Sequence, residues 1–336
     1  MKTRVGINGF GRIGRSVFRI LMERRDQFEV VAINDLFDNE QLAYLLRYDT
    51  VMGPFEGEVS VDADSMTVDG HRIVMTAEKD PAALPWGAHG ADLVVESTGV
   101  FRSREKLLPH LAAGAKKVLL TVPPDDALDA MIVLGVNDDE LRPEHQLVSN
   151  ASCTTNCLAP IARILDEAFG IEEGLVTTVH AYTNDQRLFD APHKDLRRSR
   201  AAAENIIPTT TGAARAVGKV LPRLKGKLDG MALRVPVPNG STIDLACRLR
   251  ARPSRAEVNA AVKAAAEGPL RGIVQFSEEP LVSSDIVGNP HSSIFDALST
   301  TSRGDGFVKV VSWYDNEWGY SNRVVDLLGH LARHVA

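Results

Sequence analysis

The sequence predicts an α/β protein with two domains. The first is a parallel-sheet domain, and the second is an α+β domain on a largely antiparallel mixed sheet. Three observations predict this class. The 336 residues suffice for two domains. In the first part of the chain, short β-branched segments alternate with helical patterns, as in sheets with helical crossovers. After residue 152 the apolar segments are longer and are typical of antiparallel strands.

The elements of the first domain follow from apolar periodicity. Val17, Ile20 and Leu21 recur at helical spacing, whereas continuous apolar segments predict buried strands. An alternating segment, 56–75, has Asp69-Gly70 at its turn and predicts an inserted hairpin. The predicted strands are 4–8, 29–34, 92–96 and 117–121, and the predicted helices are 12–24, 41–48 and 105–113.

The second domain is expected to begin with a helix from Cys153 to about residue 169. A final helix, 320–334, carries apolar residues at helical spacing and is expected to pack on the first domain. The predicted strands are 175–179, 233–238, 242–250 and 309–314. We therefore expect a nucleotide-binding domain, 1–151, joined by the C-terminal helix 317–336, and a catalytic domain, 152–316.

Composition narrows the function classes. The chain is 44% hydrophobic and 24% charged, with a formal net charge of −6, which argues against nucleic acid or an anionic membrane as the primary partner. The N-terminus does not read as a signal peptide, and no apolar stretch is long enough to span a bilayer. Three cysteines predict neither a disulfide framework nor a metal site. We expect a cytoplasmic enzyme.

A glycine motif predicts a dinucleotide site. Gly9, Gly11 and Gly14 match G-x-G-x-x-G between a predicted strand and a predicted helix, which makes the domain Rossmann-type. The glycines let backbone approach a pyrophosphate at the helix N-terminus. Asp35 follows the second strand, where a carboxylate binds the ribose hydroxyls and repels a 2′-phosphate. The motif therefore favours NAD over NADP, against the alternative of a glycine-rich turn that binds nothing.

Cys153 is the candidate nucleophile. Asn150 and Ser152 precede an amphipathic segment and are candidate N-caps, which places Cys153 in the first helical turn. The helix field there is expected to lower the pKa of the thiol. Cys157 lies one turn later and is interpreted as a small buried hydrophobic residue.

His180 is the candidate general base, because it ends a predicted strand and such a position can face a cleft. A structural histidine is the alternative, since the chain has nine histidines.

These residues belong to segments that resemble the glyceraldehyde-3-phosphate dehydrogenase family over essentially the whole chain. The cysteine segment and the Thr-Thr-Thr-Gly segment are highly specific together. The matching segments are INGFGRIGR at 7–15, SNASCTTNC at 149–157, HAYTNDQR at 180–187, IIPTTTGAA at 206–214, LRVPVPN at 233–239 and WYDNEWGY at 313–320.

The resemblance implies that Cys153 attacks an aldehyde while His180 takes the proton. Oxidation by NAD leaves a thioester, which inorganic phosphate releases as an acyl phosphate. Binding roles carry over to three sets of residues. The implied ligands of the substrate phosphate are Thr183, Arg198 and Arg234, and those of the second anion site are Ser152, Thr154, Thr211 and Gly212. The implied cofactor ligands are Gly9, Gly11, Arg12, Ile13, Gly14, Asp35, Ser97, Thr98, Gly99, Thr121 and Asn316.

The resemblance also implies a homotetramer, with the loop from about 181 to 204 at a subunit interface near a neighbour's cofactor. Within the basic cluster of this loop only Arg198 is assigned to substrate, and a solvated face is the interpretation for the rest. Ala191-Pro192 departs from the dipeptides common in strict NAD users, so we expect NAD preference with some tolerance of NADP.

Alternatives remain open at the level of substrate and class. Segments 103–105 and 128–145 resemble the sister family of erythrose-4-phosphate dehydrogenases. Thr183, Thr211 and Gly212 favour the three-carbon substrate. A non-catalytic NAD-binding or RNA-binding protein would predict a degraded cysteine–histidine–phosphate constellation. A non-phosphorylating semialdehyde dehydrogenase would predict a site for one carboxylate, against which Arg234 argues.

Overall fold

The computed structural model describes residues 2–335. Contact clustering divides the chain into two compact units. The first takes in the chain up to Ile132, the segment Asp139–Ala151 and the chain from Ser321 onward. The second consists of Val133–Asp138 and Ser152–Tyr320.

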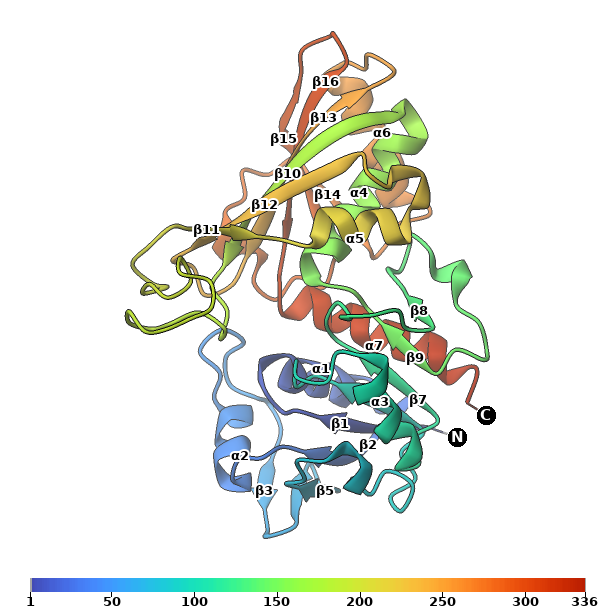
Figure 1. Ribbon diagram of the computed structural model, residues 1–336, viewed down its shortest axis with the longest axis vertical. Coiled ribbons are helices and arrows are strands. Elements are labelled where there is room, and N and C mark those ends of the chain that lie inside the picture. Colours follow the sequence, from blue (N-terminus) through green and yellow to red (C-terminus); the bar gives the residue numbers. More distant parts are fainter. Residues whose placement is uncertain (1, 336) are drawn as a thin grey trace. The chain divides into compact units, whose positions relative to one another are not determined.

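The first unit contains a nine-stranded sheet in the order β3-β4-β5-β2-β1-β6-β7-β9-β8 within the described residues (Figure 1). Six of its pairings are parallel, from β5·β2 through β8·β9, which confirms the predicted Rossmann-type sheet. Its strands are β1 (Thr3–Asn8), β2 (Phe28–Asn34), β3 (Val59–Val61), β4 (Ser65–Val68), β5 (His71–Thr76), β6 (Leu93–Glu96), β7 (Lys117–Leu120), β8 (Ala130–Met131) and β9 (Leu147–Ser149).

The helices of this unit bury the apolar positions that the periodicity indicated. Val17 and Ile20 of α1 are fully buried, as are Val324 and Leu328 of α7. Arg24, which ends α1, is ion-paired with Asp326 of α7 at 2.5 Å. The helices are α1 (Arg12–Glu23), α2 (Asn39–Arg47), η1 (Pro81–Ala83), α3 (Arg104–Ala112) and α7 (Trp318–Ala332), and η2 (Asp138–Glu140) lies at a boundary between the units.

The predicted hairpin is present, but its second strand also extends the main sheet. β5 pairs antiparallel with β4 and parallel with β2. Asp69 and Gly70 join β4 to β5 with φ of 47° and 77°, the left-handed values that a tight hairpin turn requires. The insertion therefore widens the sheet.

The second unit contains a seven-stranded sheet in the order β11-β12-β10-β13-β16-β15-β14. Four of its pairings are antiparallel and two are parallel, which confirms the predicted mixed sheet. Its strands are β10 (Ile171–Ala181), β11 (Ile207–Thr210), β12 (Leu228–Val235), β13 (Ser241–Leu249), β14 (Val274–Ser277), β15 (Ser293–Ser302) and β16 (Phe307–Tyr314).

Three helices lie together against this sheet (Figure 1). α4 packs on α5, α6 and four of the strands, so it is the central helix of the layer. The helices are α4 (Cys153–Phe169), α5 (Ala213–Val220), η3 (Pro222–Leu224), α6 (Arg255–Glu267) and η4 (Ser283–Ile286).

Several strand boundaries differ from the prediction, and two of these strands bear on the site. β12 begins at Leu228 and ends at Val235, because Pro236 and Pro238 lack the N–H that continued pairing needs. β10 continues to Ala181, so His180 is a residue of the strand and pairs with Arg234 of β12. Among residues 2–335, no helix is both long and apolar enough to cross a membrane.

Candidate active site

In the first unit, each glycine of the motif has a separate steric role. Gly9 has φ of 92°, and a Cβ there would lie 2.8 Å from the Thr98 backbone nitrogen. A Cβ at Gly14 would lie 2.1 Å from the Gly9 carbonyl oxygen, so the helix start is packed on the turn. A Cβ at Gly11 would meet nothing within 4 Å. Gly11 thus leaves room at the start of α1, where a pyrophosphate would approach free N–H groups.

A pocket of about 420 Å³ opens at the carboxyl ends of β1, β2 and β6. Ligands of open α/β sheets bind at this edge. Gly9, Gly11, Asp35, Ser97 and Thr98 line the pocket. Five of the predicted dinucleotide residues thus line one pocket of the first unit, whereas the predicted Asn316 belongs to the second unit.

Asp35 and Ser97 hold the glycine turn from two sides. Asp35 Oδ2 accepts a hydrogen bond of 2.6 Å from the Phe10 backbone N–H. Ser97 Oγ donates to the Gly9 carbonyl at 2.7 Å. Thr121 is buried and donates to the Glu96 carbonyl at 3.0 Å. The turn is therefore a constrained element, as a site for a rigid pyrophosphate requires.

The Arg12 side chain is engaged by a carboxylate. Its guanidinium donates to both carboxylate oxygens of Asp49, at 2.8 and 3.1 Å. Burial alone would raise the pKa of Asp49, but hydrogen bonds from Arg12 and two backbone N–H groups hold it below the usual value. Arg12 and Ile13 open α1, so their place at the helix N-terminus agrees with the prediction.

In the second unit, Cys153 is the first residue of α4. Ser152 is the N-cap, and its Oγ accepts from the Thr155 backbone N–H at 3.1 Å. Cys153 is half-buried. Cys157 is fully buried, and burial raises its thiol pKa to about 12, which supports the interpretation of an inert core residue.

Cys153 and His180 form a pair. Sγ lies 3.5 Å from Nε2 of His180. Nδ1 of His180 lies 2.7 Å from the Ala181 carbonyl oxygen. Nδ1 has two possible partners: when it donates to that carbonyl, Nε2 presents its lone pair to the thiol, as a general base does, and when it accepts from Arg234 Nη1, 2.8 Å away, the proton lies on Nε2.

Burial, and then the charge of Arg234, lower the pKa of His180 to about 3. The imidazole is therefore neutral at neutral pH. Arg234 Nη1 lies 2.8 Å from Nδ1 and donates to the Ala181 carbonyl at 2.9 Å, so its charge bears directly on the pair.

One expectation for Cys153 was wrong. The helix N-terminus was expected to lower the thiol pKa, but burial raises it. The positive charge of Arg234 and hydrogen bonds from Thr154 offset part of this rise. The pair thus rests as a neutral thiol beside a neutral imidazole.

Tyr314 is a site residue that sequence reasoning did not assign. Its hydroxyl lies 2.9 Å from Thr154 Oγ1 and 2.8 Å from Thr178 Oγ1, and its ring meets that of His180 edge-on. It is fully buried, and burial raises its pKa well above the usual value. Its position at the end of a predicted strand was the available signal.

The predicted ligands of the substrate phosphate are linked by a second unassigned residue, Asp185. Thr183 Oγ1 and Arg198 Nη1 both donate to its carboxylate. Burial would raise the pKa of Asp185, but these partners and Arg234 hold it below the usual value. The carboxylate of Asp185 thus accepts from a threonine and an arginine that were both predicted to bind phosphate.

The remaining predicted residues lie at an element's start or beside the pair. Thr211 and Gly212 precede α5, and Thr211 Oγ1 accepts from the Ala213 backbone N–H at 3.2 Å. α5 packs against α4. Asn316 is buried, and its Oδ1 accepts from Ser241 Oγ at 2.7 Å. Among residues 2–335, no group of three or more histidine, cysteine or acidic side chains could hold a metal ion.

A dinucleotide pocket in one unit and a cysteine–histidine pair beside arginines in the other indicate the class of NAD-dependent oxidoreductases. Comparison with known families specifies this class further. Residues 3–104 match the glyceraldehyde 3-phosphate dehydrogenase NAD binding domain, and residues 152–316 match the C-terminal domain of the same family.

Relatives that match nearly the full length of the chain agree with this family assignment. The chain is 59% identical to glyceraldehyde-3-phosphate dehydrogenase of Geobacillus stearothermophilus over 333 residues, 99% of each chain. It is 57% identical to glyceraldehyde-3-phosphate dehydrogenase 1 of Bacillus subtilis, over 99% of each chain. It is also 57% identical to glyceraldehyde-3-phosphate dehydrogenase 2 of Streptomyces avermitilis, over 97% of this chain and 98% of the relative. The chain belongs to the glyceraldehyde-3-phosphate dehydrogenase family.

Proposed function

We propose that the protein oxidises D-glyceraldehyde 3-phosphate with NAD and inorganic phosphate to 1,3-bisphosphoglycerate and NADH. The observation that carries the proposal is the 3.5 Å contact between Cys153 Sγ and His180 Nε2. A nucleophile within reach of an oriented base is the geometry of covalent catalysis. Arg234 beside His180, and Arg198 beside Thr183 through Asp185, add the cations that a phosphorylated aldehyde needs.

In the proposed reaction, Sγ of Cys153 bonds to the aldehyde carbon as its proton passes to Nε2 of His180. The C=O pair moves to oxygen, so the product is the oxyanion of a hemithioacetal, with the proton held on Nε2. When the C=O bond re-forms, hydride leaves that carbon and a thioester remains on Cys153. An oxygen of inorganic phosphate then attacks the thioester carbonyl, and the C–S bond breaks. The acyl phosphate leaves, and the sulfur takes back its proton from Nε2.

The first unit fits the nicotinamide dinucleotide. The open space at Gly11 admits a pyrophosphate, and the half-buried carboxylate of Asp35 is placed to accept from ribose hydroxyls. When bound, NAD supplies the hydride acceptor. Gly9, Gly14, Ser97, Thr98, Gly99 and Thr121 would shape its pocket, and Asn316 is proposed to orient the nicotinamide amide.

Two anion-binding assignments complete the proposal. Thr183, Arg198 and Arg234 bind the phosphate of the aldehyde. Ser152, Thr154, Thr211 and Gly212 bind the attacking phosphate. The support is chemical, since hydroxyls, helix N-terminal N–H groups and guanidinium groups are the donors that phosphate prefers.

The test is the rate of NADH formation with purified protein, with glyceraldehyde 3-phosphate and erythrose 4-phosphate supplied separately, each with and without inorganic phosphate. We expect preference for the three-carbon aldehyde and dependence on phosphate. Preference for the four-carbon aldehyde would favour the sister activity and contradict the roles given to Thr183 and Thr211.

Cofactor choice is proposed as NAD preference with some tolerance of NADP. Asp35 supports the preference by repelling a 2′-phosphate. Ala191 supports the tolerance because it is small and exposed. Equal efficiency with both cofactors, or preference for NADP, would contradict the proposal.

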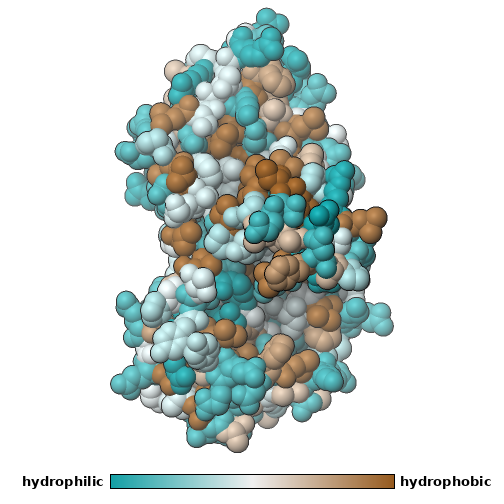
Figure 2. Space-filling view, turned by 90° about the vertical axis from the view of Figure 1, so that its left-hand side faces the viewer, coloured by the Kyte–Doolittle hydropathy of each residue, from teal (hydrophilic) through white to brown (hydrophobic). Residues whose placement is uncertain are grey.

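We propose a homotetramer that uses the loop 181–204. Leu188, Phe189 and Leu196 of this loop are 76%, 79% and 82% exposed. Figure 2 shows the side of the molecule that carries this loop in Figure 1, with several brown hydrophobic side chains among teal ones. Large exposed apolar residues on one loop support an association surface. Sedimentation of the wild type and of Phe189→Asp tests this, and a wild-type monomer would contradict it.

We also propose that the functional domains follow the expected division, 1–151 with the C-terminal helix 317–336, and 152–316. A cytoplasmic location is proposed because the reaction needs Cys153 as a thiol, which a reducing compartment maintains.

A further inference from the structure

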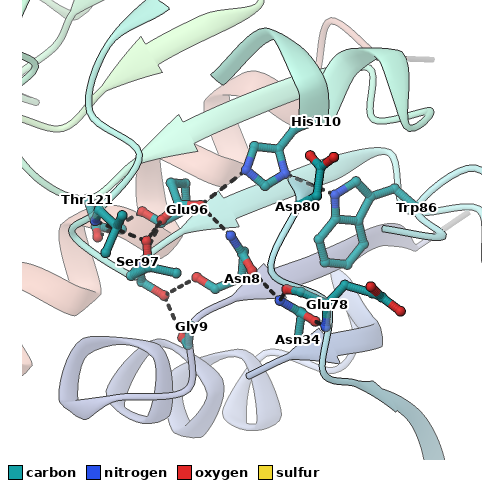
Figure 3. Close-up of polar contacts among 12 residues, drawn as sticks. Asn8, Gly9, Asn34, Glu78, Asp80, Trp86, Glu96, Ser97, His110 and Thr121 are labelled. Atoms are coloured by element: carbon teal, nitrogen blue, oxygen red, sulfur yellow. Dashed lines mark hydrogen bonds and ion pairs between the residues drawn. The ribbon is translucent and has the colours of Figure 1, made fainter. Parts of the chain in front are cut away.

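A hydrogen-bond network of buried polar side chains crosses the first unit beside the dinucleotide pocket, and the proposed reaction does not use it (Figure 3). Trp86, His110 and Glu96 are 0% exposed, and Asn8 and Asn34 are 1% and 4% exposed. Burying polar groups is costly unless each finds a partner. The partners of these five residues indicate what the arrangement does.

Glu96 is the centre of this hydrogen-bond network. Its Oε2 accepts from Asn8 Nδ2 at 2.6 Å and contacts His110 Nε2 at 3.1 Å. Its Oε1 accepts from both the backbone N–H, at 2.8 Å, and the hydroxyl of Thr98. Four donors converge on one carboxylate, which accepts on both oxygens when it is ionised.

Trp86 fixes the direction of the hydrogen bond between His110 and Glu96. Trp86 Nε1 lies 3.0 Å from His110 Nδ1, and an indole nitrogen can only donate. Nδ1 must therefore accept, which leaves the imidazole proton on Nε2, where it points at Glu96. His110 is thus held as a neutral donor to the carboxylate, as the dashed lines of Figure 3 trace.

From Glu96 the hydrogen-bond network reaches two walls of the 420 Å³ pocket. On one wall, Glu96 holds Thr98, whose neighbour Ser97 is bonded to the Gly9 carbonyl. On the other, Asn8 accepts from Asn34 at 2.8 Å, and Asn34 in turn accepts from the Glu78 backbone N–H at 2.8 Å. Strands β1, β2 and β6 are therefore tied together at the edge where a dinucleotide would bind.

We propose that Glu96, oriented by His110 and Trp86, is a positioning residue that presets the dinucleotide pocket before the cofactor arrives. Glu96 acts through Thr98 and Asn8, which line the pocket. Holding both walls in place removes an ordering cost from binding and so raises affinity. The inference rests on the proposed function, since it assumes that this pocket takes NAD.

The experiment measures the dissociation constant for NAD by calorimetry, together with kcat and the KM for NAD, for wild type and three variants. Glu96→Gln places an amide N–H₂ against donors, and His110→Leu removes the donor to Glu96. His110→Gln keeps a donor at the reach of Nε2. We expect the first two to weaken NAD binding by at least about tenfold while kcat at saturating NAD stays near wild type, and His110→Gln to recover most of the affinity.

Asp129→Asn is the matched control. Asp129 is a carboxylate of the same unit that accepts from Arg104 and, at 2.8 Å each, from the Gln146 and Leu147 backbone N–H groups. It holds the amino end of β9, away from the carboxyl ends where the pocket opens. We expect it to lose stability without loss of NAD affinity.

Wild-type affinity in Glu96→Gln and His110→Leu, or an equal loss in Asp129→Asn, would overturn the inference. If those two variants fail to fold, Trp86→Phe serves as the deciding variant, because it removes the indole N–H that donates to His110 and keeps an aromatic ring. It should weaken NAD binding several-fold, and unchanged affinity would again overturn the inference. A wild-type protein that binds no NAD would instead refute the proposed function.

Discussion

At the residue scale, Arg234 opposes the burial that raises the pKa of the nucleophile. Its positive charge favours the thiolate of Cys153 and disfavours the imidazolium of His180, so it lowers the pKa of both groups. Arg198 bears less on this pair, since among the causes that lower the pKa of His180 it follows burial and Arg234. The two arginines can therefore be separated by a measurement on Cys153.

Replacing Arg234 by methionine keeps the length of the side chain and removes its charge. The thiol pKa should rise, so less thiolate is present at pH 7 and alkylation of Cys153 by uncharged iodoacetamide should slow several-fold. The pH profile of that rate should move to higher pH. Arg198→Met should leave the profile near wild type. A shift to lower pH in Arg234→Met would contradict this account of the pair.

Asp185 occupies donors of Thr183 and Arg198, the residues proposed to bind the substrate phosphate. Its carboxylate binds Thr183 and Arg198, so it competes with a phosphate and repels it. Asp185→Asn keeps an acceptor but loses the charge, and the KM for the phosphorylated aldehyde should fall several-fold, less so at high salt. Asp190→Asn is the control, since Asp190 pairs with exposed Arg200 of the same loop. A higher KM in Asp185→Asn would show that the carboxylate positions Arg198.

At the scale of the element, substitutions in the glycine turn can distinguish an effect on folding from an effect on NAD binding. Gly11→Ala adds a methyl group where no protein atom lies within 4 Å, so the free energy of unfolding should change by less than about 0.5 kcal/mol. The same methyl group would meet the pyrophosphate, and NAD affinity should fall at least about tenfold. Gly14→Ala should lose both stability and affinity, because its Cβ would lie 2.1 Å from the Gly9 carbonyl oxygen. Wild-type NAD affinity in Gly11→Ala, measured by calorimetry, would contradict the site.

Two helix N-caps of the second unit offer a matched comparison. Ser152 caps α4 and Ser254 caps α6, each by accepting a backbone N–H bond. Either serine changed to alanine should cost about 1 kcal/mol of stability, measured by urea unfolding. Ser152→Ala should also raise the KM for inorganic phosphate, whereas Ser254→Ala should leave all kinetic constants unchanged. Equal kinetics in the two variants would remove Ser152 from the anion site.

At the scale of the whole molecule, local sequence patterns predicted the features that depend on residues close together in the sequence. Gly9, Gly11 and Gly14 in sequence predicted the turn, and the periodicity of Val17, Ile20 and Leu21 predicted α1. The strands β8, β9, β11, β14 and β15 and the helices α5 and α6 were not predicted. Most of these elements are short, so few apolar positions mark them in the sequence.

The site could be predicted as far as the resemblance reached. Cys153 and His180 were both named, and the structure brings them to 3.5 Å. Tyr314 lies 160 residues from its partner Thr154, and that contact depends on where β16 lies beside α4, which no local pattern gives. The thiol pKa was misjudged because the helix position is visible in the sequence, whereas burial of the sulfur is not.

The thioester on Cys153 is the central claim, and its most direct test is one turnover without phosphate. Protein, NAD and glyceraldehyde 3-phosphate are mixed by rapid flow while NADH absorbance is followed, and the quenched protein is digested for mass spectrometry. We predict a burst approaching one NADH per chain, a phosphorylated three-carbon acyl group held as a thioester on the peptide that contains Cys153, and steady turnover once inorganic phosphate is added. No burst, or an acyl group on another residue, would contradict the account.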